Sequence, residues 1–177
     1  MLTALDQQIS ILVTENRSDF LTAIFSVFSF LGNWQFIVLA MLLIIIVLAL
    51  KKKTLFIAPF ILAVAGSSFL TYLGKLYFAR PRPLYSVFME TGFSLPSGHA
   101  TVAVAFFACL AFILVKLNFE KKSGLIYSSA ILIILLIGFS RIYLGAHYLT
   151  DILAGYLIGL VGLIFGIIWT KKSLNRV

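Results

Sequence analysis

Charged and sulfur-bearing side chains are scarce in this sequence. Charged residues make up 11% of its 177 residues, against roughly 25% in an ordinary soluble domain. The chain has six acidic residues and two histidines, so little of it is ionisable. The one cysteine, Cys109, lies in an apolar run, which excludes a disulfide within the chain and predicts a packing role. The length predicts a single domain, residues 1–177.

The positive charges of the chain accompany its apolar runs. The formal net charge is +8, and hydrophobic residues make up 62% of the sequence. Most basic residues form small clusters beside long apolar segments, which is typical of charges that orient membrane proteins. We therefore predict an integral membrane protein that contacts membrane lipids and has no nucleic-acid partner. A signal peptide is not expected, because residues 1–20 lack a basic start followed by an apolar core.

The apolar runs predict an all-α, polytopic transmembrane helix bundle with about five spanning helices. A spanning helix needs about 20 apolar residues, and the candidates are residues 34–50, 54–73, 99–115, 124–139 and 152–170. Gly32-Asn33 interrupts the uncharged run before the first of them. Residues 5–31 mix polar and apolar side chains, which predicts one or two N-terminal amphipathic helices in the membrane interface. Small residues suited to close helix packing mark two spans: Gly155, Gly159, Gly162 and Gly166 in the last, and Gly66, Ser67 and Ser68 in the second.

The basic clusters give this bundle an orientation. Nine of the fourteen basic residues lie on one side of it: Lys51, Lys52, Lys53, Lys116, Lys121, Lys122, Lys171, Lys172 and Arg176. The positive-inside rule makes that side cytoplasmic. We expect a cell-membrane protein whose C-terminus is cytoplasmic. Its N-terminus and three polar motifs would then face the extracytoplasmic side.

The first polar motif is KLYFARPRP, residues 75–83. Its three cations, Lys75, Arg80 and Arg82, repel one another unless an anion lies among them. Arginine presents a planar fork that holds phosphate oxygens in pairs, and lysine acts as a point charge. The two prolines end the helix and stiffen the loop. The alternative is a set of interfacial cations that bind lipid headgroups or orient the chain, although as an orientation signal they point the wrong way.

The second motif is PSGH, residues 96–99, directly before the third span. Ser97 is a good helix cap, and Gly98 allows the backbone to approach a ligand closely. The unpaired N–H groups of a helix start favour an anion. His99 can donate a proton near neutral pH. Taken alone, the motif mainly indicates a helix start with an interfacial histidine.

The third motif is SRIYLGAHYLTD, residues 140–151. A spacing of four predicts that His147 and Asp151 share one helix face. A carboxylate bonded to one ring nitrogen fixes the tautomer and leaves the other nitrogen free to attack. Arg141 would direct its fork at the same anion. The alternatives are a structural His–Asp pair that caps the last helix, and a metal site made of His99, His147 and Asp151, which the surrounding cations disfavour.

In this order the motifs resemble the signature of the type-2 phosphatidic acid phosphatase superfamily. The matching patterns are Lys, six residues, Arg-Pro; then Pro-Ser-Gly-His; then Ser-Arg, five residues, His, three residues, Asp, all within residues 75–151. That superfamily includes membrane lipid phosphatases and soluble vanadium haloperoxidases, and the membrane character of this chain disfavours the latter. The resemblance implies a phosphatase that needs no metal or other cofactor.

The resemblance also implies a role for each matched residue. His147 would be the nucleophile that forms a phosphohistidine, Asp151 would orient it, and His99 would protonate the leaving oxygen. The phosphoryl oxygens would be held by Lys75, Arg82, Ser97, Gly98 and Arg141. Arg80 lies outside the required positions of the pattern, and we predict that it and Tyr85 contact a headgroup or a second phosphate.

The expected reaction is hydrolysis of the terminal phosphate of a phospho- or pyrophospho-lipid. Undecaprenyl pyrophosphate is the first expectation, because the compact build resembles members that act on it; phosphatidylglycerophosphate and the 1-phosphate of lipid A follow. Side chains between or beside the first two motifs would discriminate among them: Tyr77, Tyr85, Phe88, Glu90 and Phe93. The alternative of a different class is a non-catalytic protein that binds or moves lipids through the same cationic pocket. A transporter would carry polar residues inside its spans, and here these are nearly absent.

Overall fold

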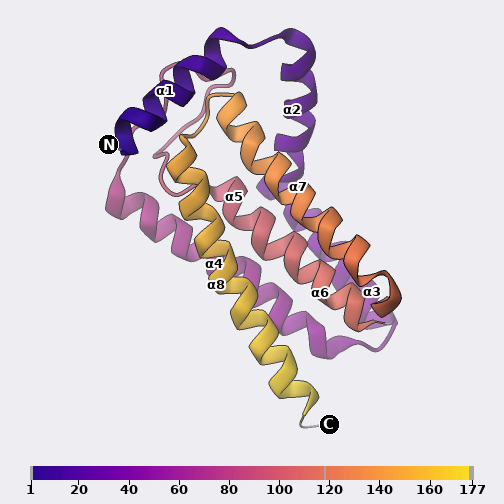
Figure 1. Ribbon diagram of the computed structural model, residues 1–177. Coiled ribbons are helices and arrows are strands. Elements are labelled where there is room, and N and C mark those ends of the chain that lie inside the picture. The colour runs from indigo at the N-terminus through magenta and orange to yellow at the C-terminus, as the bar shows by residue number, and fades with distance from the viewer. Residues whose placement is uncertain (1, 118, 176–177) are drawn as a thin grey trace.

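The fold is a bundle of helices joined by short turns and one long loop. The computed structural model describes residues 2–117 and 119–175, and in these ranges it contains no strand. The α-helices are α1 (Leu2–Glu15), α2 (Asp19–Leu31), α3 (Trp34–Leu50), α4 (Ile57–Phe78), α5 (Gly98–Ala103), α6 (Cys109–Lys116), α7 (Ser123–Tyr143) and α8 (Leu149–Leu174). Short turns at Thr54–Phe56 (η1), Val104–Ala108 (η2) and Glu120–Lys122 (η3) complete the helical segments. Figure 1 shows the arrangement, which confirms the predicted all-α class.

Four helical segments are long and apolar enough to cross a membrane. They are Thr54–Phe78, Gly98–Lys116, Glu120–Tyr143 and Leu149–Leu174. Helices α2 and α3 make a fifth candidate when they are taken together as one span bent by 48°. The bend lies at the predicted break, where the Asn33 side chain accepts a hydrogen bond from the Gln35 N–H at 3.2 Å and starts α3. The predicted count of about five spans is therefore confirmed for the described chain, but the first span needs α2 together with α3 and not residues 34–50 alone, because α3 by itself is too short.

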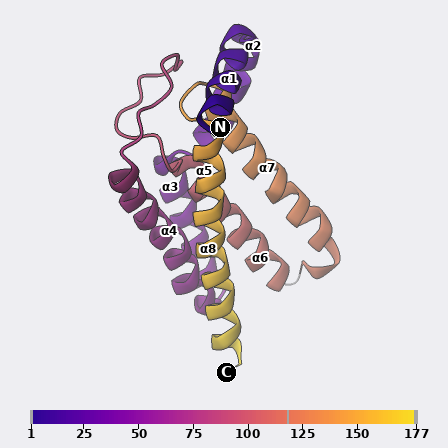
Figure 2. The ribbon, with the colours of Figure 1, turned by 60° about the vertical axis from the view of Figure 1, so that its left-hand side comes forward.

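The two N-terminal helices take different courses. Figures 1 and 2 show α1 lying across one end of the bundle, as an interfacial helix would. Helix α2 instead runs along the end of α7. The Phe25 ring packs against Phe139 and Tyr143 of α7, with ring centroids 5.2 and 4.6 Å apart. Helix α2 therefore belongs to the bundle more closely than the sequence predicts.

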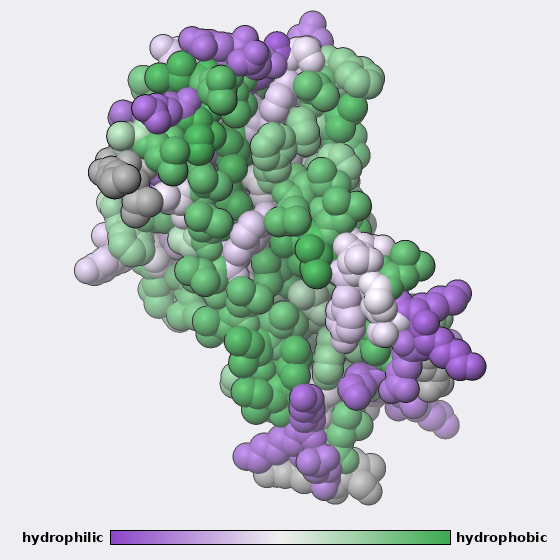
Figure 3. Space-filling view, in the orientation of Figure 1, coloured by the Kyte–Doolittle hydropathy of each residue, from purple (hydrophilic) through white to green (hydrophobic). Residues whose placement is uncertain are grey.

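Polarity divides the molecule into bands. In the space-filling view of Figure 3, a wide apolar region lies between hydrophilic groups at the two ends. The described lysine clusters lie at the end where α3 meets η1, where α6 meets α7, and where α8 finishes (Figures 1 and 2). This is the common side that the sequence predicts. Arg176, assigned to the same cluster, lies outside the described residues.

Close packing of α8 depends on its small residues. A Cβ atom on Gly159 would lie 2.6 Å from the Thr101 carbonyl oxygen, and one on Gly162 would lie 2.6 Å from that of Ala63. Such contacts are too short for any side chain, so α8 approaches both α5 and α4 at backbone distance. The predicted small face of α8 is thus confirmed. In α4, Ser67 is buried against α8, whereas Gly66 faces open space.

The third span is not a uniform α-helix. Between α5 and α6, residues Val104–Ala108 form a π-helical turn. A π turn holds one more residue than an α turn and so changes which side chains face a given direction on either side of it. The turn lies in the core, where Val104, Ala105 and Phe106 are buried.

Candidate active site

Three segments form a site at the end of the bundle opposite the lysine clusters. They are the long loop that follows α4, the start of α5 and the short turn between α7 and α8. The three polar motifs lie in these segments and in the adjoining ends of α4, α7 and α8, so the predicted convergence of distant parts of the sequence occurs. Helix α1 covers the same end (Figures 1 and 2).

The turn between α7 and α8 places His147. The backbone N–H groups of Ala146 and His147 both donate to the Arg141 carbonyl oxygen, at 3.0 and 3.2 Å. This fold-back needs a left-handed residue, which Gly145 supplies with φ of 70°. A Cβ atom at Gly145 would also collide with the Tyr85 carbonyl. The turn is therefore specified by a glycine within the third motif.

His147 and Asp151 contact each other as predicted, but not for the predicted reason. The ring Nδ1 lies 3.4 Å from Asp151 Oδ2. They do not share a helix face, because α8 begins only at Leu149 and His147 belongs to the preceding turn. Asp151 is in the first turn of α8, and its Oδ2 also accepts the Tyr148 N–H at 3.0 Å. A carboxylate that caps its own helix therefore turns back toward the imidazole.

The other ring nitrogen of His147 faces a cation. Arg82 Nη1 lies 3.3 Å from His147 Nε2 and donates to the Ala146 carbonyl at 3.0 Å. Arginine can only donate, so Nε2 is the unprotonated nitrogen and the proton is on Nδ1, toward Asp151. Burial lowers the pKa of His147 to about 4; the Asp151 contact opposes this shift, and the charges of Arg141, Arg82 and Lys75 add to it. The ring is thus neutral near pH 7, with a lone pair directed at the cations.

Arg141 lies at the centre of the cationic group, where it is paired with the carboxylate of Glu90. Arg141 is 2% exposed and donates to Ser29 Oγ at 2.5 Å and to the Glu90 carboxylate. Glu90 also lies 3.7 Å from Arg82. Burial raises the pKa of Glu90, but the charges of Arg141 and Arg82 outweigh burial and hold it below its ordinary value. A protein carboxylate therefore occupies the position where an anionic ligand is expected.

Arg80 contacts protein carboxylates rather than an open surface. Its guanidinium donates to Asp151 at 2.8 Å, Asp6 at 2.7 Å and the Thr150 hydroxyl at 2.7 Å, and it lies over the Tyr148 ring. Burial alone lowers the pKa of Arg80, but the two carboxylates raise it above its ordinary value. Two carboxylates thus already hold the guanidinium, which the sequence does not predict, and the headgroup contact of Arg80 stays a prediction.

The remaining predicted residues lie around this centre. Lys75, in the last turn of α4, donates from Nζ to the Phe93 carbonyl at 2.5 Å. The Ser97 hydroxyl is fully buried and caps α5, so its contact with a phosphate stays a prediction. Tyr85 is 60% exposed and borders a cavity of about 290 Å³ beneath α1, and its headgroup contact also stays a prediction.

His99 faces a cavity of about 250 Å³ at the bend between α2 and α3. The lining residues come from α2–α3, α4 and α5: Gly32, Trp34, Ser68, Thr71, Gly98, His99 and Val102. The His99 ring is also close enough to Arg141 and Arg82 for their charges to act on it. His99 therefore borders a mostly uncharged cavity close to the cationic centre, and its role as proton donor stays a prediction.

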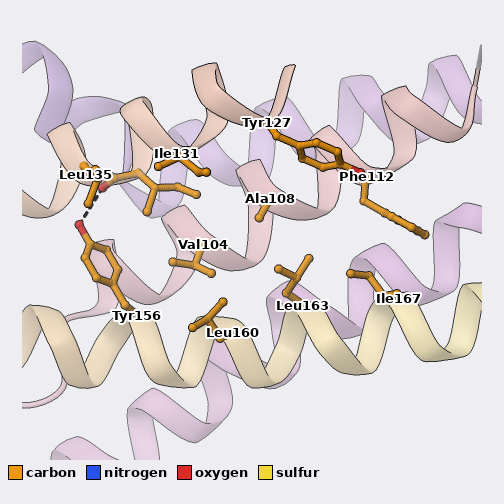
Figure 4. Close-up of a pocket in the computed structure, with 11 residues that line it drawn as sticks. Val104, Ala108, Phe112, Tyr127, Ile131, Leu135, Tyr156, Leu160, Leu163 and Ile167 are labelled. Atoms are coloured by element: carbon orange, nitrogen blue, oxygen red, sulfur yellow. Dashed lines mark hydrogen bonds between the residues drawn. The ribbon is translucent and has the colours of Figure 1, made fainter. Parts of the chain in front are cut away.

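A second, apolar cavity of about 370 Å³ lies deeper in the bundle. Figure 4 shows its side chains extending from α7, from the α5–α6 segment and from α8. The only hydrogen bond drawn joins the Tyr156 hydroxyl to the Ile134 carbonyl at 2.9 Å. No charged residue lines this cavity among the described residues. It suits hydrocarbon and not a phosphate group.

The metal-site alternative finds no support in the side-chain geometry. Within residues 2–117 and 119–175, no three His, Cys, Asp or Glu side chains gather closely enough to hold a metal ion. His99, His147 and Asp151 therefore do not form the ligand set considered from the sequence. That the reaction needs no metal stays a prediction.

Two residues of the site were missed in the sequence. Asp6 and Ser29 come from the N-terminal helices and bind Arg80 and Arg141, respectively. The only signal for Asp6 was its place as an acidic residue on an amphipathic segment, and nothing marked Ser29. Glu90 was noted for substrate discrimination, but its ion pair with Arg141 was not foreseen.

The fold and the site together define a helical integral membrane protein with a buried histidine–carboxylate pair among cations at one end. The family model of the PAP2 superfamily matches residues 56–175. The chain belongs to this superfamily, which confirms the resemblance seen in its motifs.

Individual relatives agree with this assignment. Phosphatidylglycerophosphatase B of Bacillus subtilis (strain 168) is 40% identical over 90 residues, which are 49% of this chain and 44% of that protein. The match therefore spans less than half of the length of that relative. A transmembrane PAP2-type phosphatidylglycerolphosphate phosphatase from Bacillus subtilis superposes with a TM-score of 0.92 at 28% identity, covering 96% of this chain and 86% of the other. LpxE of Aquifex aeolicus superposes with a TM-score of 0.71 at 28% identity, covering 94% and 95%.

Proposed function

We propose that this protein is a membrane lipid phosphatase that works through a phosphohistidine intermediate. The observation that carries the proposal is the position of His147 between Asp151 and Arg82. Its Nδ1 proton is held by a carboxylate while its Nε2 lone pair is directed at cations, which is the arrangement needed to attack an anionic phosphorus. Phosphoryl transfer needs mainly positioning and neutralisation of oxygen charge.

The proposed reaction has two steps. In the first, His147 Nε2 forms a bond to phosphorus, the bond from phosphorus to the lipid oxygen breaks, and His99 gives that oxygen a proton. In the second, water attacks phosphorus, His99 takes a proton from it, and the P–N bond breaks to release phosphate. Lys75, Arg82, Arg141, Ser97 and the Gly98 backbone hold the phosphoryl oxygens throughout. The cavity beside His99 offers room for the leaving group.

For the substrate, we propose phosphatidylglycerophosphate first. The sequence match and the solved structure from Bacillus subtilis both carry that activity in their names, and the structure has a TM-score of 0.92 with this chain. Undecaprenyl pyrophosphate and the lipid A 1-phosphate remain the alternatives, because each presents a terminal phosphoryl group to the same cations. We further propose that the site opens on the extracytoplasmic side of the cell membrane and that the C-terminus is cytoplasmic, because the lysine clusters lie at the opposite end.

The test is phosphate release by the purified protein from each of the three lipids, compared as kcat/KM. A quenched single turnover with ³²P-labelled lipid should also leave label on the wild-type protein, in an acid-labile bond. His147→Ala should abolish both signals while it elutes and unfolds like the wild type. Turnover should survive EDTA, and vanadate should inhibit. Turnover by His147→Ala would refute the phosphohistidine, and a folded protein that binds all three lipids but releases no phosphate would favour the non-catalytic alternative.

A further inference from the structure

We infer that Asp6 is a positioning residue for the nucleophile and that it acts through Arg80 and Asp151. The inference rests on the proposed phosphatase function. Asp6 lies on the N-terminal helix α1, outside residues 56–175, which match the family, and outside all three motifs. Nothing in the sequence pattern assigns it a role. Its contacts in the folded chain assign it this role.

Asp6 is a buried charge on a helix that is otherwise largely exposed. The residue is 1% exposed, whereas Leu5 beside it is 45% exposed. A buried carboxylate is costly unless it is paired and hydrogen-bonded. Asp6 is paired on both oxygens: Oδ2 accepts from Arg80 Nη2 at 2.7 Å and from the Thr150 hydroxyl, and Oδ1 accepts the Thr150 N–H at 3.1 Å.

These contacts connect α1 to the nucleophile in three steps. Arg80 uses one arm, Nη2, for Asp6 and the other, Nη1, for Asp151 Oδ1 at 2.8 Å. Asp151 uses its second oxygen, Oδ2, for His147 Nδ1 at 3.4 Å. The two oxygens of Asp151 are therefore divided between the guanidinium and the imidazole. Whatever fixes Arg80 also fixes the plane of the carboxylate that orients the ring.

Asp6 has a second effect through charge. It shares the positive charge of Arg80 with Asp151, so that the guanidinium does not act on Asp151 alone. If Asp6 is neutralised, the whole charge of Arg80 falls on Asp151. Asp151 then stabilises the imidazole proton less well, and the ring becomes a weaker nucleophile. Loss of the Asp6 contact also frees one arm of Arg80, which loosens the orientation of the whole group.

Because Asp6 is enclosed by Arg80 and Thr150, it acts on the chemical step and not on lipid binding. Neutralising it should lower kcat by about tenfold or more, the size expected when a supporting hydrogen bond to a catalytic group is lost. KM should stay within about twofold. A residue that only held α1 in place would change the thermal midpoint and leave kcat of the folded protein unchanged.

The experiment measures kcat, KM and the thermal midpoint of full-length Asp6→Asn in detergent with the preferred lipid. The matched control is Glu15→Gln, which removes the same charge from the same helix at an exposed position that contacts no described cation. A double-mutant cycle adds Arg80→Met and the double variant. If Asp6 acts through Arg80, Asp6→Asn should lower kcat in the wild-type background and have no further effect when Arg80 is already Met.

Each outcome decides the inference. Loss of kcat in Asp6→Asn that disappears in the Arg80→Met background supports it. Wild-type kcat in a folded Asp6→Asn, or an equal loss in both backgrounds, overturns it. If Asp6→Asn does not fold, Thr150→Val removes the hydroxyl that Asp6 and Arg80 share, and an unchanged kcat there also overturns it. Wild-type turnover that depends on His147 keeps the phosphatase proposal standing in every one of these cases.

Discussion

At the scale of single residues, the site depends on one imidazole whose two nitrogens face opposite charges. Nδ1 of His147 lies beside Asp151, and Nε2 lies beside Arg82. A carboxylate at Nδ1 and a cation at Nε2 together increase the electron density at Nε2. They do so only when the carboxylate is well placed beside Nδ1. The support of Asp151 therefore matters as much as its presence.

The protonation of His147 sets an expected pH dependence. Burial, opposed by Asp151 and reinforced by the neighbouring cations, lowers its pKa from 6.5 to about 4. The nucleophile must be neutral, so the acidic limb of kcat/KM for the wild type should fall near pH 4. An acidic limb near pH 6.5 in the wild type would contradict this assignment.

The lowered pKa of His147 also affects the free energy of unfolding. Between about pH 6.5 and pH 4 the unfolded chain binds a proton at His147 that the folded chain does not. The free energy of unfolding should therefore be highest above pH 6.5 and fall as the pH drops through this window. Thermal midpoints measured across the window check the sign, with the His147→Ala variant as the control in which the fall should be smaller.

Glu90 should compete with anions for the same cations. Its carboxylate binds Arg141 and approaches Arg82, so a phosphate must displace it. Glu90→Gln should therefore tighten inhibition by vanadate about tenfold, which corresponds to loss of one charge-assisted contact. Glu120→Gln, at the opposite end of the bundle, should leave the inhibition constant unchanged. Weaker vanadate binding by Glu90→Gln would mean that the carboxylate supports the anion site instead.

At the scale of elements, the turn between α7 and α8 is the least replaceable part of the site. Gly145→Ala places a Cβ atom at φ of 70° and against the Tyr85 carbonyl. We expect a loss of about 1–3 kcal/mol in stability and a lower kcat, because His147 belongs to this turn. Gly92→Ala separates the effect of the left-handed backbone from that of the collision, since Gly92 has φ of 71° but open space around it. Thermal unfolding of both variants should show the larger loss at Gly145.

Most elements could be predicted from the sequence, because apolar length and helix breakers act locally. Gly32-Asn33 ended one helix and began another, and the glycines of α8 marked a packing face. The course of α2 could not be predicted, because it depends on the packing of Phe25 against α7, far along the chain. The helix-face argument for His147 and Asp151 failed because α8 starts two residues after the histidine.

At the scale of the whole molecule, the two ends of the bundle carry different chemistry. One end holds the lysine clusters, and the other holds the histidines, their cations and the described carboxylates that pair with them. The three motifs were enough to place His99, His147 and Asp151 in one site. They could not reveal Asp6 or Ser29, because those contacts join residues more than a hundred positions apart or depend on how the N-terminal helices fold back.

The proposed orientation in the membrane can be tested with single cysteines. The native Cys109 is buried, so it should react slowly. In intact cells, a membrane-impermeant maleimide should label Met89→Cys, a fully exposed position in the loop beside the site, and should not label Lys52→Cys until the membrane is permeabilised. The reverse pattern would place the site on the cytoplasmic side.

The π-helical turn at Val104–Ala108 connects the length of the third span to the aim of its histidine. Deleting a single residue there would let the span continue as a regular helix, with its lower half still packed in the core. Because the π turn accommodates one more residue than an α turn, everything before it, His99 included, would then keep nearly the same direction around the helix axis. Straightening the turn without a deletion would instead rotate these residues by about 100°. A deletion within the π turn should therefore be tolerated. A deletion elsewhere in Gly98–Lys116 changes the hydrophobic length of the span as little, but it would turn His99 away from the position in which we propose that it serves the leaving group.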